Sequence, residues 1–320
     1  AAGNRQSVEL SPRTAVRIFT GAAVPRGADT VVMQEKIRTE NGRLIVEDEK
    51  LQPGGNVRPQ GSEIRAGELA LTRGSRLTPA ALGYLAGIGL DEVEVYPPPS
   101  VSIIVTGNEL QQPGKPLEFG QVYECNSFSL LAALEQLNIR DVKVERVADD
   151  PDALTKTLQK ATDSDVILLT GGVSVGDYDF VLQAAANCQI DPLFHKIKQR
   201  PGKPLYFGKK SEKLVFGLPG NPSSVLTCFY IHVVPALDQL MNRSGNTRAV
   251  VAPLSAPCQK AAGITQYLKG HYDGSMVTPL DAQESYRMRS FAQSNCLIQL
   301  DEERTSYTAG DPVKVHLLPV

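Results

Sequence analysis

The hydrophobic and polar positions between about residues 100 and 245 alternate between two periodicities. Residues 101–105 form a continuous apolar run, which is typical of a strand buried on both faces of a sheet. Residues 142–147, in which Val recurs among charged residues, and the mainly apolar residues 165–169 and 214–216 are further stretches of strand length. We therefore predict four strands in this part of the chain.

Helical periodicity follows these runs. Asn126-Ser127 is expected to cap one helix and Asp150-Pro151 to begin a second. A third is expected after the glycine-rich loop that follows residues 165–169, and a long fourth from Pro222. In the first two, apolar residues recur at every third or fourth position: Leu130, Leu134 and Leu137, then Leu154, Leu158 and Ala161. Alternating strands and helices predict an α/β fold with a doubly wound, mostly parallel sheet. Ligands bind such sheets at the carboxyl ends of the strands.

The chain before and after this section is expected to be mostly β. Residues 16–19 and 30–33 are predicted as short strands, and Asn41-Gly42 between two alternating runs predicts a tight hairpin. Residues 78–89 change to helical spacing, with a proline in the first turn. Alternation in residues 312–317 predicts a strand of a small C-terminal β domain.

Two stretches divide the chain into regions. Tyr96-Pro97-Pro98-Pro99 cannot continue a helix or a central strand, and residues 242–246 are polar and contain glycine. We therefore expect four regions: a mostly β region at 1–60, a linker with a helix at 61–97, the α/β domain at 98–246 and a C-terminal β domain at 247–320.

Composition narrows the classes of function. The 320 residues are 42% hydrophobic and 21% charged, as in an ordinary globular protein, and no run of about 18 apolar residues predicts a membrane span. A net charge of −2 gives no support for a general nucleic-acid binder, so any anion site must be local.

Five scattered cysteines favour reduced thiols and a cytoplasmic location. The first residues lack an initiator Met and a signal peptide, so we expect residues before them.

Glycine-rich loops lie where strands give way to helices. One contains Gly171, Gly172 and Ser174, and a second spans residues 217–224. Because glycine has no Cβ, the backbone N–H groups of such loops can approach a phosphate closely. A tight turn without a ligand is the alternative explanation. The GxxxxGK[ST] pattern of a P-loop is absent.

Two cations, Arg200 and Lys203, flank Pro201-Gly202. A rigid turn could aim both at one phosphate or oxyanion, and Lys196 and Lys198 add to the local positive charge. A solvated basic loop is the alternative.

Four carboxylates are expected at the same edge of the sheet: Glu109, Asp149, Asp150 and Asp179. Carboxylates beside phosphates favour Mg²⁺, which keeps most of its waters and takes one or two carboxylates. Asp150 before a proline is better explained as a helix cap, so Glu109 and Asp179 are the candidate metal ligands. The sequence shows no nucleophile elbow and no Cys/His pair.

Taken together and in order, these motifs resemble one family, the molybdopterin molybdenumtransferases of the MoeA and gephyrin E-domain type. The motifs are Thr-Gly-Asn-Glu-Leu at 106–110, Thr-Gly-Gly-Val-Ser-Val-Gly-Asp-Tyr-Asp at 170–179, Pro-Gly-Lys-Pro at 201–204 and Gly-Leu-Pro-Gly-Asn-Pro at 217–222. Residues 17–25 and 29–35 are similar to the family's second domain, so the resemblance covers nearly the whole chain.

The resemblance implies an enzyme that inserts molybdenum from molybdate into adenylylated molybdopterin, with Mg²⁺ as cofactor and release of AMP. It also implies a cytoplasmic homodimer whose site lies between the central domain of one subunit and the β domain of the other, with the molybdopterin adenylyltransferase as a candidate partner. Residues 1–60 and 61–97 would be remnants of the second and first domains, because the family's Asp-Asn-Ser-Ala-Met-Asp-Gly-like motif does not occur in this sequence.

The resemblance also implies roles for particular residues. Catalysis would fall to Glu109, Asp149, Asp179 and Lys203, with the first three holding Mg²⁺ or orienting the diphosphate. Binding of the substrates would fall to Thr20, Gly171, Gly172, Ser174, Arg200, Lys203, Pro219, Asn221, Pro222 and Ser224. At residues 264–269, where the family commonly has an Arg-containing pattern, only Lys269 keeps a cation.

Two other functions remain open at this point. A molybdopterin adenylyltransferase would resemble the central domain alone, and the flanking β regions argue against it. A non-catalytic binding or scaffold protein of the gephyrin type would bind partners without turnover. At residues 61–64 the sequence reads Gly-Ser-Glu-Ile, where the family usually has Gly-Glu-Asp. This departure at Glu63 and the one at Ile264 favour the scaffold function slightly.

Overall fold

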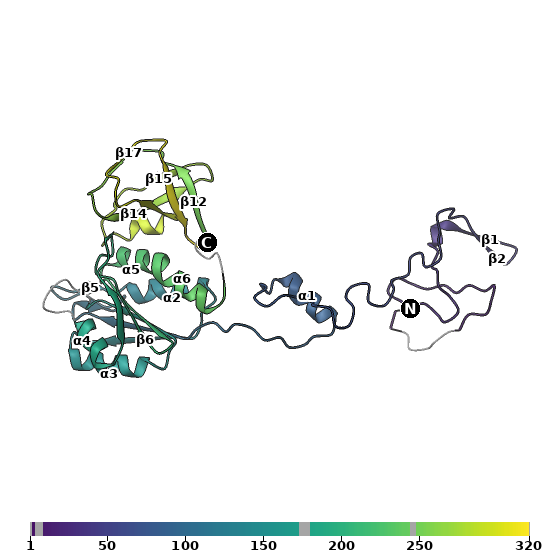
Figure 1. Ribbon diagram of the computed structural model, residues 1–320, viewed down its shortest axis with the longest axis horizontal. Helices are drawn as coiled ribbons and strands as arrows, with labels where there is room; N and C mark the ends of the chain where they lie inside the picture. The colour runs from purple at the N-terminus through teal and green to yellow at the C-terminus, as the bar shows by residue number, and fades with distance from the viewer. Residues whose placement is uncertain (1, 4–8, 173–179, 244–247, 320) are drawn as a thin grey trace. The chain divides into compact units, whose positions relative to one another are not determined.

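The computed structural model describes residues 2–3, 9–172, 180–243 and 248–319 (Figure 1). These form two compact units, Ala1–Val93 and Glu94–Val320, which are described separately below. Among the helices of these ranges, none is long and apolar enough to cross a membrane.

The first unit contains the predicted hairpin and the predicted helix. Strands β1 (Ile37–Glu40) and β2 (Arg43–Val46) pair antiparallel after a short 3₁₀ helix, η1 (Gln34–Lys36). Asn41 and Gly42 both have positive φ, as this type of hairpin turn requires. Helix α1 (Pro79–Gly87) begins after Thr78, whose side chain accepts a hydrogen bond from the N–H of Ala81 at 3.2 Å.

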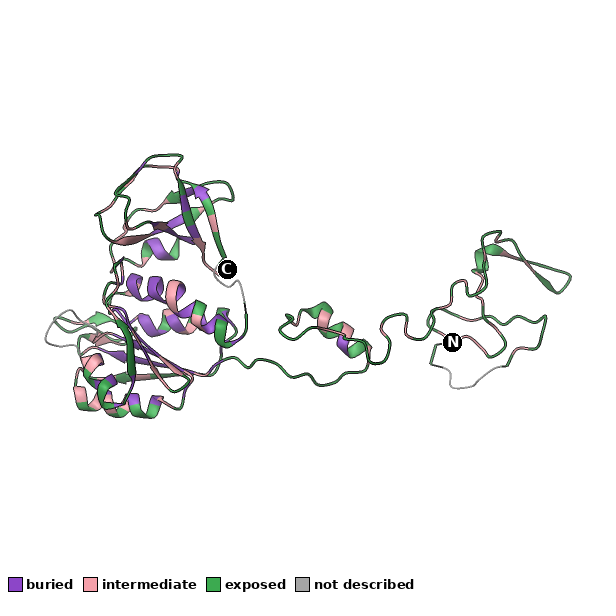
Figure 2. Cartoon of the chain, viewed as in Figure 1, coloured by how far each residue is buried: buried purple, intermediate pink, exposed green. Residues whose placement is uncertain are grey.

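The strands predicted at residues 16–19 and 30–33 are wrong, because neither segment is in a β ladder. In the second segment, the N–H of Val31 donates to the carbonyl of Gly55, and the Val31 carbonyl accepts from the side chain of Asn56. The backbone groups of Val31 that a neighbouring strand would need are therefore bonded to the turn at Gly55 and Asn56. Among the described residues of this unit, only Leu85 is buried (Figure 2).

A six-stranded sheet forms the centre of the second unit. Its order is β6 (Val142–Val147), β3 (Val101–Thr106), β7 (Val166–Thr170), β11 (Lys213–Leu218), β10 (Tyr206–Lys210) and β8 (Asp191–His195). The first four strands are parallel, β10 pairs antiparallel with β11, and β8 pairs antiparallel with β10. The predicted α/β class with a mostly parallel sheet is therefore confirmed.

Helices cover both faces of this sheet (Figure 1). Helices α3 (Pro151–Ala161) and α4 (Phe180–Asn187) lie on one face. On the other lie α2 (Asn126–Gln136) and a long helix made of α5 (Pro222–Cys228), a π-helical segment η2 (Phe229–Val233) and α6 (Val234–Leu240).

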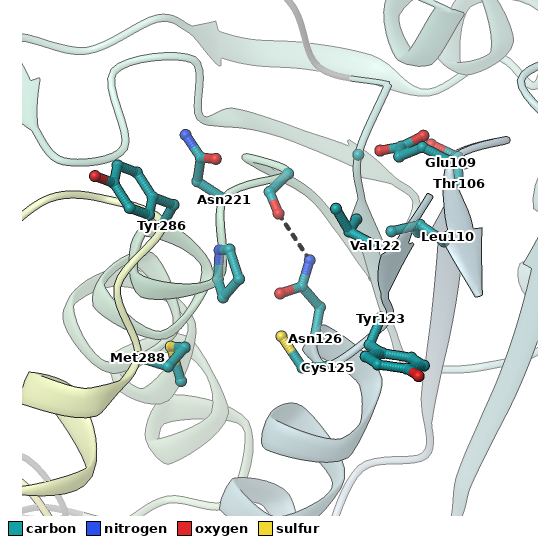
Figure 3. Close-up of a pocket in the computed structure, with 13 residues that line it drawn as sticks. Thr106, Glu109, Leu110, Val122, Tyr123, Cys125, Asn126, Asn221, Tyr286 and Met288 are labelled. Carbon is teal, nitrogen blue, oxygen red and sulfur yellow. Dashed lines mark hydrogen bonds between the residues drawn. The ribbon is translucent and has the colours of Figure 1, made fainter. Parts of the chain in front are cut away.

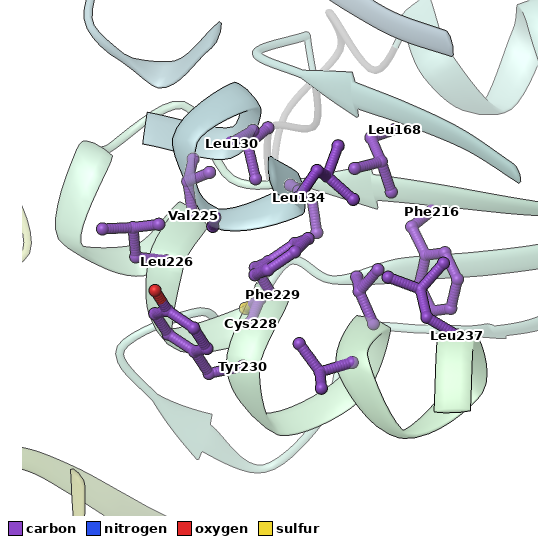
Figure 4. Close-up of a cluster of buried hydrophobic side chains, with 14 of the residues drawn as sticks. Leu130, Leu134, Leu168, Phe216, Val225, Leu226, Cys228, Phe229, Tyr230 and Leu237 are labelled. Atoms are coloured by element: carbon purple, nitrogen blue, oxygen red, sulfur yellow. The ribbon is translucent and has the colours of Figure 1, made fainter. Parts of the chain in front are cut away.

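The covered faces explain why every residue of β3 is buried and most of them are apolar. Ile103 packs in the cluster beneath α2 and α5, which Figure 4 shows, and Ile104 packs in the cluster beneath α3 and α4. Successive side chains of a strand point to opposite faces, so both faces of β3 need apolar residues. Burial of one such side chain stabilises the fold by about 1.5 to 3 kcal/mol.

The predicted helix caps are right at Asp150 and wrong at Asn126. Asp150 accepts from the N–H of Ala153 at 2.7 Å. Asn126 instead donates its side-chain N–H to the carbonyl of Gly220 at 2.9 Å, and buried Glu124 accepts from the N–H of Ser127 at 2.7 Å. The carboxylate of Glu124 thus caps the helix in place of the Asn126 amide, because that amide bonds to Gly220 instead.

The C-terminal region is a small β domain, as predicted. Its sheet has the order β12 (Arg248–Pro253), β18 (Pro312–Leu317), β16 (Cys296–Leu300), β14 (Thr265–Tyr272) and β15 (Val277–Pro279). Helix α7 (Arg289–Ala292) precedes β16, and β13 (Cys258–Gln259) pairs with β17 (Ser306–Tyr307). Strand β9 (Gln199–Arg200) comes from the α/β domain and pairs in parallel with β14, so the two domains share backbone hydrogen bonds.

Candidate functional site

The strand ends that carry the sequence motifs lie at one edge of the six-stranded sheet. Thr106 at the end of β3 is opposite Val147, and Thr170 at the end of β7 is opposite Leu218. Strand β10 runs the other way and begins with Tyr206 opposite Gly217, so the turn before it emerges at the same edge. The loops after β3, β6, β7 and β11 and the turn before β10 therefore share this edge.

A cavity of about 550 Å³ opens at this edge (Figure 3). Thr106, Glu109, Gly171, Gly220 and Asn221 line it from the strand-end loops. Its other wall is more apolar, and much of it comes from the short ladder of β4 (Leu110–Gln111) and β5 (Val122–Tyr123). The remaining lining residues are Cys125, Asn126, Pro222, Tyr286 and Met288.

The two glycine-rich loops contact each other at the cavity. A Cβ on Gly220 would lie 3.8 Å from the Cα of Gly171. Gly171 has a φ of +86°, and a Cβ there would collide with the carbonyl oxygen of Thr106. Close packing of two strand ends therefore requires glycine at position 171, whether or not a ligand is bound.

The C-terminal domain closes one side of the cavity with residues 285–288. The side-chain N–H of Asn221 donates to Ser285 Oγ at 3.0 Å, and the N–H of Ser223 donates to the Ser285 carbonyl at 3.0 Å. These two bonds fix Ser285 against the start of α5. Tyr286 and Met288 follow and reach the cavity from the C-terminal domain, opposite Leu110 and Val122 in Figure 3.

Lys269 of β14 holds this C-terminal segment from within. Its ammonium group is buried and donates to the carbonyls of Ala282, Glu284 and Arg287 at 2.9, 3.3 and 3.1 Å. Burial lowers the pKa of Lys269, although nearby Glu284 acts in the opposite direction. The cation noted in the sequence at this position is therefore engaged with the backbone of the cavity wall.

Of the predicted acids, Glu109 reaches the cavity and Asp149 lies beside it. Asp149 accepts from the N–H of Asn108 at 3.1 Å, and the Asn108 side chain accepts from the N–H of Asp149 at 3.2 Å. This reciprocal pair ties the loop after β6 to the loop after β3. Within the described ranges, no group of three or more His, Cys, Asp or Glu side chains could hold a metal ion.

The predicted cations lie at the same edge but do not line the cavity. Arg200 and Lys203 are both exposed, and the peptide bond between Arg200 and Pro201 is cis. Lys198 forms an ion pair with Glu302 of the C-terminal domain at 2.8 Å, so its charge is partly neutralised. Arg200 and Lys203 are the two cations of the turn itself and face solvent, and the exposed Lys196 and Lys198 precede it.

Known proteins resemble the chain over nearly its whole length. The molybdopterin molybdenumtransferase of Haemophilus influenzae is 35% identical over 334 residues, which cover 99% of this chain and 81% of that protein. The chain belongs to the molybdopterin molybdenumtransferase family.

Another relative and a solved structure also match the chain over nearly its whole length. The molybdopterin molybdenumtransferase of Bacillus subtilis is 32% identical and covers 99% of this chain, which spans 76% of that protein. A crystal structure of a molybdopterin biosynthesis MoeA protein from Pyrococcus horikoshii matches with a TM-score of 0.83 and 30% identity, covering 99% of this chain and 78% of that one.

Family models divide the chain into three parts. Residues 1–89 match the MoeA N-terminal region (domain I and II), residues 102–239 a probable molybdopterin binding domain, and residues 251–318 the MoeA C-terminal region (domain IV). The resemblance seen in the sequence motifs is therefore confirmed. Because the flanking parts also match, the chain is not a lone domain of the adenylyltransferase type.

The residues implied by the family motifs have different places in the structure. Glu109, Gly171, Asn221 and Pro222 line the cavity, and Gly172 and Pro219 belong to the same loops. Ser224 is buried within α5 and is not among the lining residues. Ser174 and Asp179 lie outside the described residues, and Thr20 belongs to the first unit.

Several residues at the cavity or beside it lie outside every motif noted in the sequence. Buried Glu124 bonds to Ser127 and pairs with Arg146 at 3.2 Å, which fixes the start of α2 beside the cavity. Tyr286 lies in a loop far along the chain from every motif. Burial, with the charge of Glu124 as a second cause, raises the pKa of the Cys125 thiol, which disfavours a thiolate nucleophile at the cavity.

Proposed function

We propose that this chain inserts molybdenum from molybdate into adenylylated molybdopterin and releases AMP. The observation that carries the proposal is the cavity at the strand-end edge, where Glu109, Gly171 and Asn221 meet in a chain of the molybdenumtransferase family. The substrates are one heterocyclic diphosphate and one tetrahedral oxyanion. A cavity with glycine turns, one acid and apolar walls suits the first of these.

The reaction needs charge neutralisation more than a protein nucleophile. Cleavage of the diphosphate leaves AMP, whose developing negative charge must be stabilised. In the proposal, backbone N–H groups at Gly171 and Gly172 bind the phosphates, and Arg200 and Lys203 bind molybdate. Asn221 and the flanking prolines Pro219 and Pro222 shape the loop, and Ser224 supports it from within α5.

Mg²⁺ fits this site through few protein ligands. Glu109 offers one carboxylate at the cavity, and Mg²⁺ needs only one or two when phosphates and waters complete its shell. We infer that Glu109, with Asp179 as the second ligand, would hold the ion, and that Asp149 orients the Glu109 loop through Asn108. When bound, Mg²⁺ would neutralise phosphate charge.

A homodimer is part of the proposal. Within the described part of the first unit, only Leu85 is buried, while Phe19, Met33 and Leu69 are exposed. A region that buries so little by itself needs another surface for stability. We infer that a second subunit supplies it and that Thr20 then contributes to the partner's site, with the molybdopterin adenylyltransferase as a candidate source of substrate.

The proposal is tested by incubating the chain with adenylylated molybdopterin, molybdate and Mg²⁺ and measuring AMP by chromatography. AMP release should depend on molybdate. Glu109→Gln should reduce the rate at least tenfold because its carboxylate charge is removed from the site. Glu118→Gln is the matched control, since Glu118 is an exposed acid of the neighbouring loop that does not line the cavity, and its rate should equal the parent's.

Two results would contradict the proposal. Equal loss in Glu109→Gln and Glu118→Gln would mean that the effect does not come from the cavity. Binding of partner proteins without any binding of adenylylated molybdopterin would favour the scaffold function instead.

A further inference from the structure

A hydrogen-bonded pair lies beneath the turn that carries Arg200 and Lys203. Gln199 precedes the turn and is 5% exposed, and its side-chain N–H donates to the carbonyl of Pro201 at 2.9 Å. The other end of the same amide, Oε1, lies 2.7 Å from Nε2 of His232 in η2. One amide therefore links the inner side of the turn to the helix that begins at the cavity.

The donors and acceptors of this pair have one consistent arrangement. The Pro201 carbonyl can only accept, so the Gln199 atom that faces it is the amide nitrogen. The atom that faces His232 is then the amide oxygen, and His232 must donate to it from Nε2–H. Burial lowers the pKa of His232 to about 4, so its ring is neutral near pH 7 and keeps this tautomer.

The surroundings of the turn restrict it further. Gly202 has a φ of +97°, and a Cβ there would collide with Cys228 Sγ of α5. The opposite side of the turn is held by the parallel pairing of β9 with Thr265 of β14. The turn thus lies between the long helix and the C-terminal domain, and its two cations face solvent.

We propose that His232 and Gln199 are positioning residues for oxyanion binding, because they hold the Arg200–Lys203 turn with both cations directed at one tetrahedral anion. This inference rests on the proposed function, in which the turn binds molybdate. Without the bond from His232, the Gln199 amide can rotate and the Pro201 carbonyl can lose its donor. The anion would then have to order the turn on binding, which weakens its affinity.

The test is calorimetric titration of molybdate into the full chain with AMP present, together with the thermal midpoint of each variant. His232→Phe keeps a ring of similar size and removes the donor, and the dissociation constant for molybdate should rise about five- to tenfold. His232→Gln retains a side-chain N–H donor and should stay within about twofold of the parent. Gln199→Leu should weaken binding as His232→Phe does, and it replaces that variant if His232→Phe does not fold.

The matched control is His316→Phe. His316 is also a partly buried histidine bonded to a glutamine, with 2.8 Å between His316 Nε2 and Gln299 Oε1, but that bond joins β18 to β16 and involves no residue of the turn. His316→Phe should lower the midpoint and leave the molybdate dissociation constant unchanged. If His232→Phe behaves in the same way, the positioning role is overturned.

A second comparison separates this inference from the function on which it rests. Lys203→Ala should weaken molybdate binding about tenfold or more, since it removes one of the two solvent-facing cations. If Lys203→Ala has no effect, the turn does not bind the oxyanion, and both the proposed role of the turn and the positioning inference fail. If Lys203→Ala weakens binding and neither His232→Phe nor Gln199→Leu does, only the positioning inference fails.

Discussion

Replacing Lys269 by methionine tests whether the C-terminal domain builds the cavity wall from within. Lys269 is 2% exposed and donates to three backbone carbonyls of residues 282–287. Methionine has a similar length but no donor, so the substitution leaves these carbonyls without the ammonium group. The segment that carries Tyr286 and Met288 to the cavity should therefore loosen.

The expected loss of stability follows from the three bonds. A hydrogen bond to a charged group contributes about 1.5 to 3 kcal/mol, although the longest of the three, at 3.3 Å, lies beyond the usual range. Burial of the ammonium group, which lowers the pKa of Lys269, offsets part of this gain. We expect Lys269→Met to reduce the free energy of unfolding by about 2 to 4 kcal/mol. For a unit of this size, that corresponds to a fall in thermal midpoint of roughly 5–15 °C.

Limited proteolysis gives a local measure of the same effect. Lys269 donates to the carbonyl of Arg287, which is the carbonyl of the bond that trypsin cleaves after this residue. Cleavage after Arg287 should become several-fold faster in Lys269→Met. Lys260→Met is the matched control, because Lys260 also donates to three carbonyls, those of Ala261, Ile264 and Glu302, at 3.1, 2.8 and 3.1 Å.

The control should lose less stability, since Lys260 is less buried, and cleavage after Arg287 should not change. Equal losses of stability in the two variants, with equal rates of cleavage after Arg287, would refute the reasoning. Lys269 would then be one of two interchangeable lysine clamps rather than the support of the cavity wall.

Two further predictions concern stability. Burial lowers the pKa of both His232 and His316 from 6.5 to about 4, so as pH falls the unfolded chain binds these protons first. Stability should therefore be complete above about pH 6.5 and fall down to about pH 4, by on the order of 3 kcal/mol for each histidine. Acid titration of the midpoint should show a smaller fall in either histidine-to-phenylalanine variant, and an unchanged profile would contradict the burial of that ring. Gly171→Ala should cost about 2 to 4 kcal/mol because its Cβ collides with Thr106, whereas Gly263→Ala, at a positive φ with nothing within 4 Å, should cost about 1 kcal/mol in chemical denaturation. Equal costs at the two glycines would contradict the close packing at Gly171.

Local periodicity was enough to predict the four parallel strands of the main sheet and the helices that follow them, but not the antiparallel strands β10 and β8. The continuous apolar run at residues 101–105 became β3, and the cap at Asp150 formed as expected. These predictions succeeded because side-chain alternation and helix capping depend on neighbours within a few residues. The strands predicted at residues 16–19 and 30–33 were wrong because a strand also needs a partner strand. The composition of a segment does not show whether a partner lies beside it.

The cavity likewise contains residues that the sequence predicted and residues that it did not. The sequence predicted that Glu109, Gly171 and Asn221 would meet at a strand-end edge, since parallel strands bring the loops at their carboxyl ends together. It gave no indication of Ser285 or Tyr286. Asn221 bonds to Ser285 across 64 residues, and Asn126 bonds to Gly220 across 94.

The sequence by itself determined the α/β class, the motifs and the edge at which they would meet. Only the tertiary structure decided that a loop of the C-terminal domain, held by Lys269, completes the cavity, and that Gln199 and His232 lie beneath the Arg200–Lys203 turn. The physical reason is the distance along the sequence over which each interaction acts. Periodicity and capping act over a few residues, whereas these contacts depend on how the strands pair and how the two domains pack.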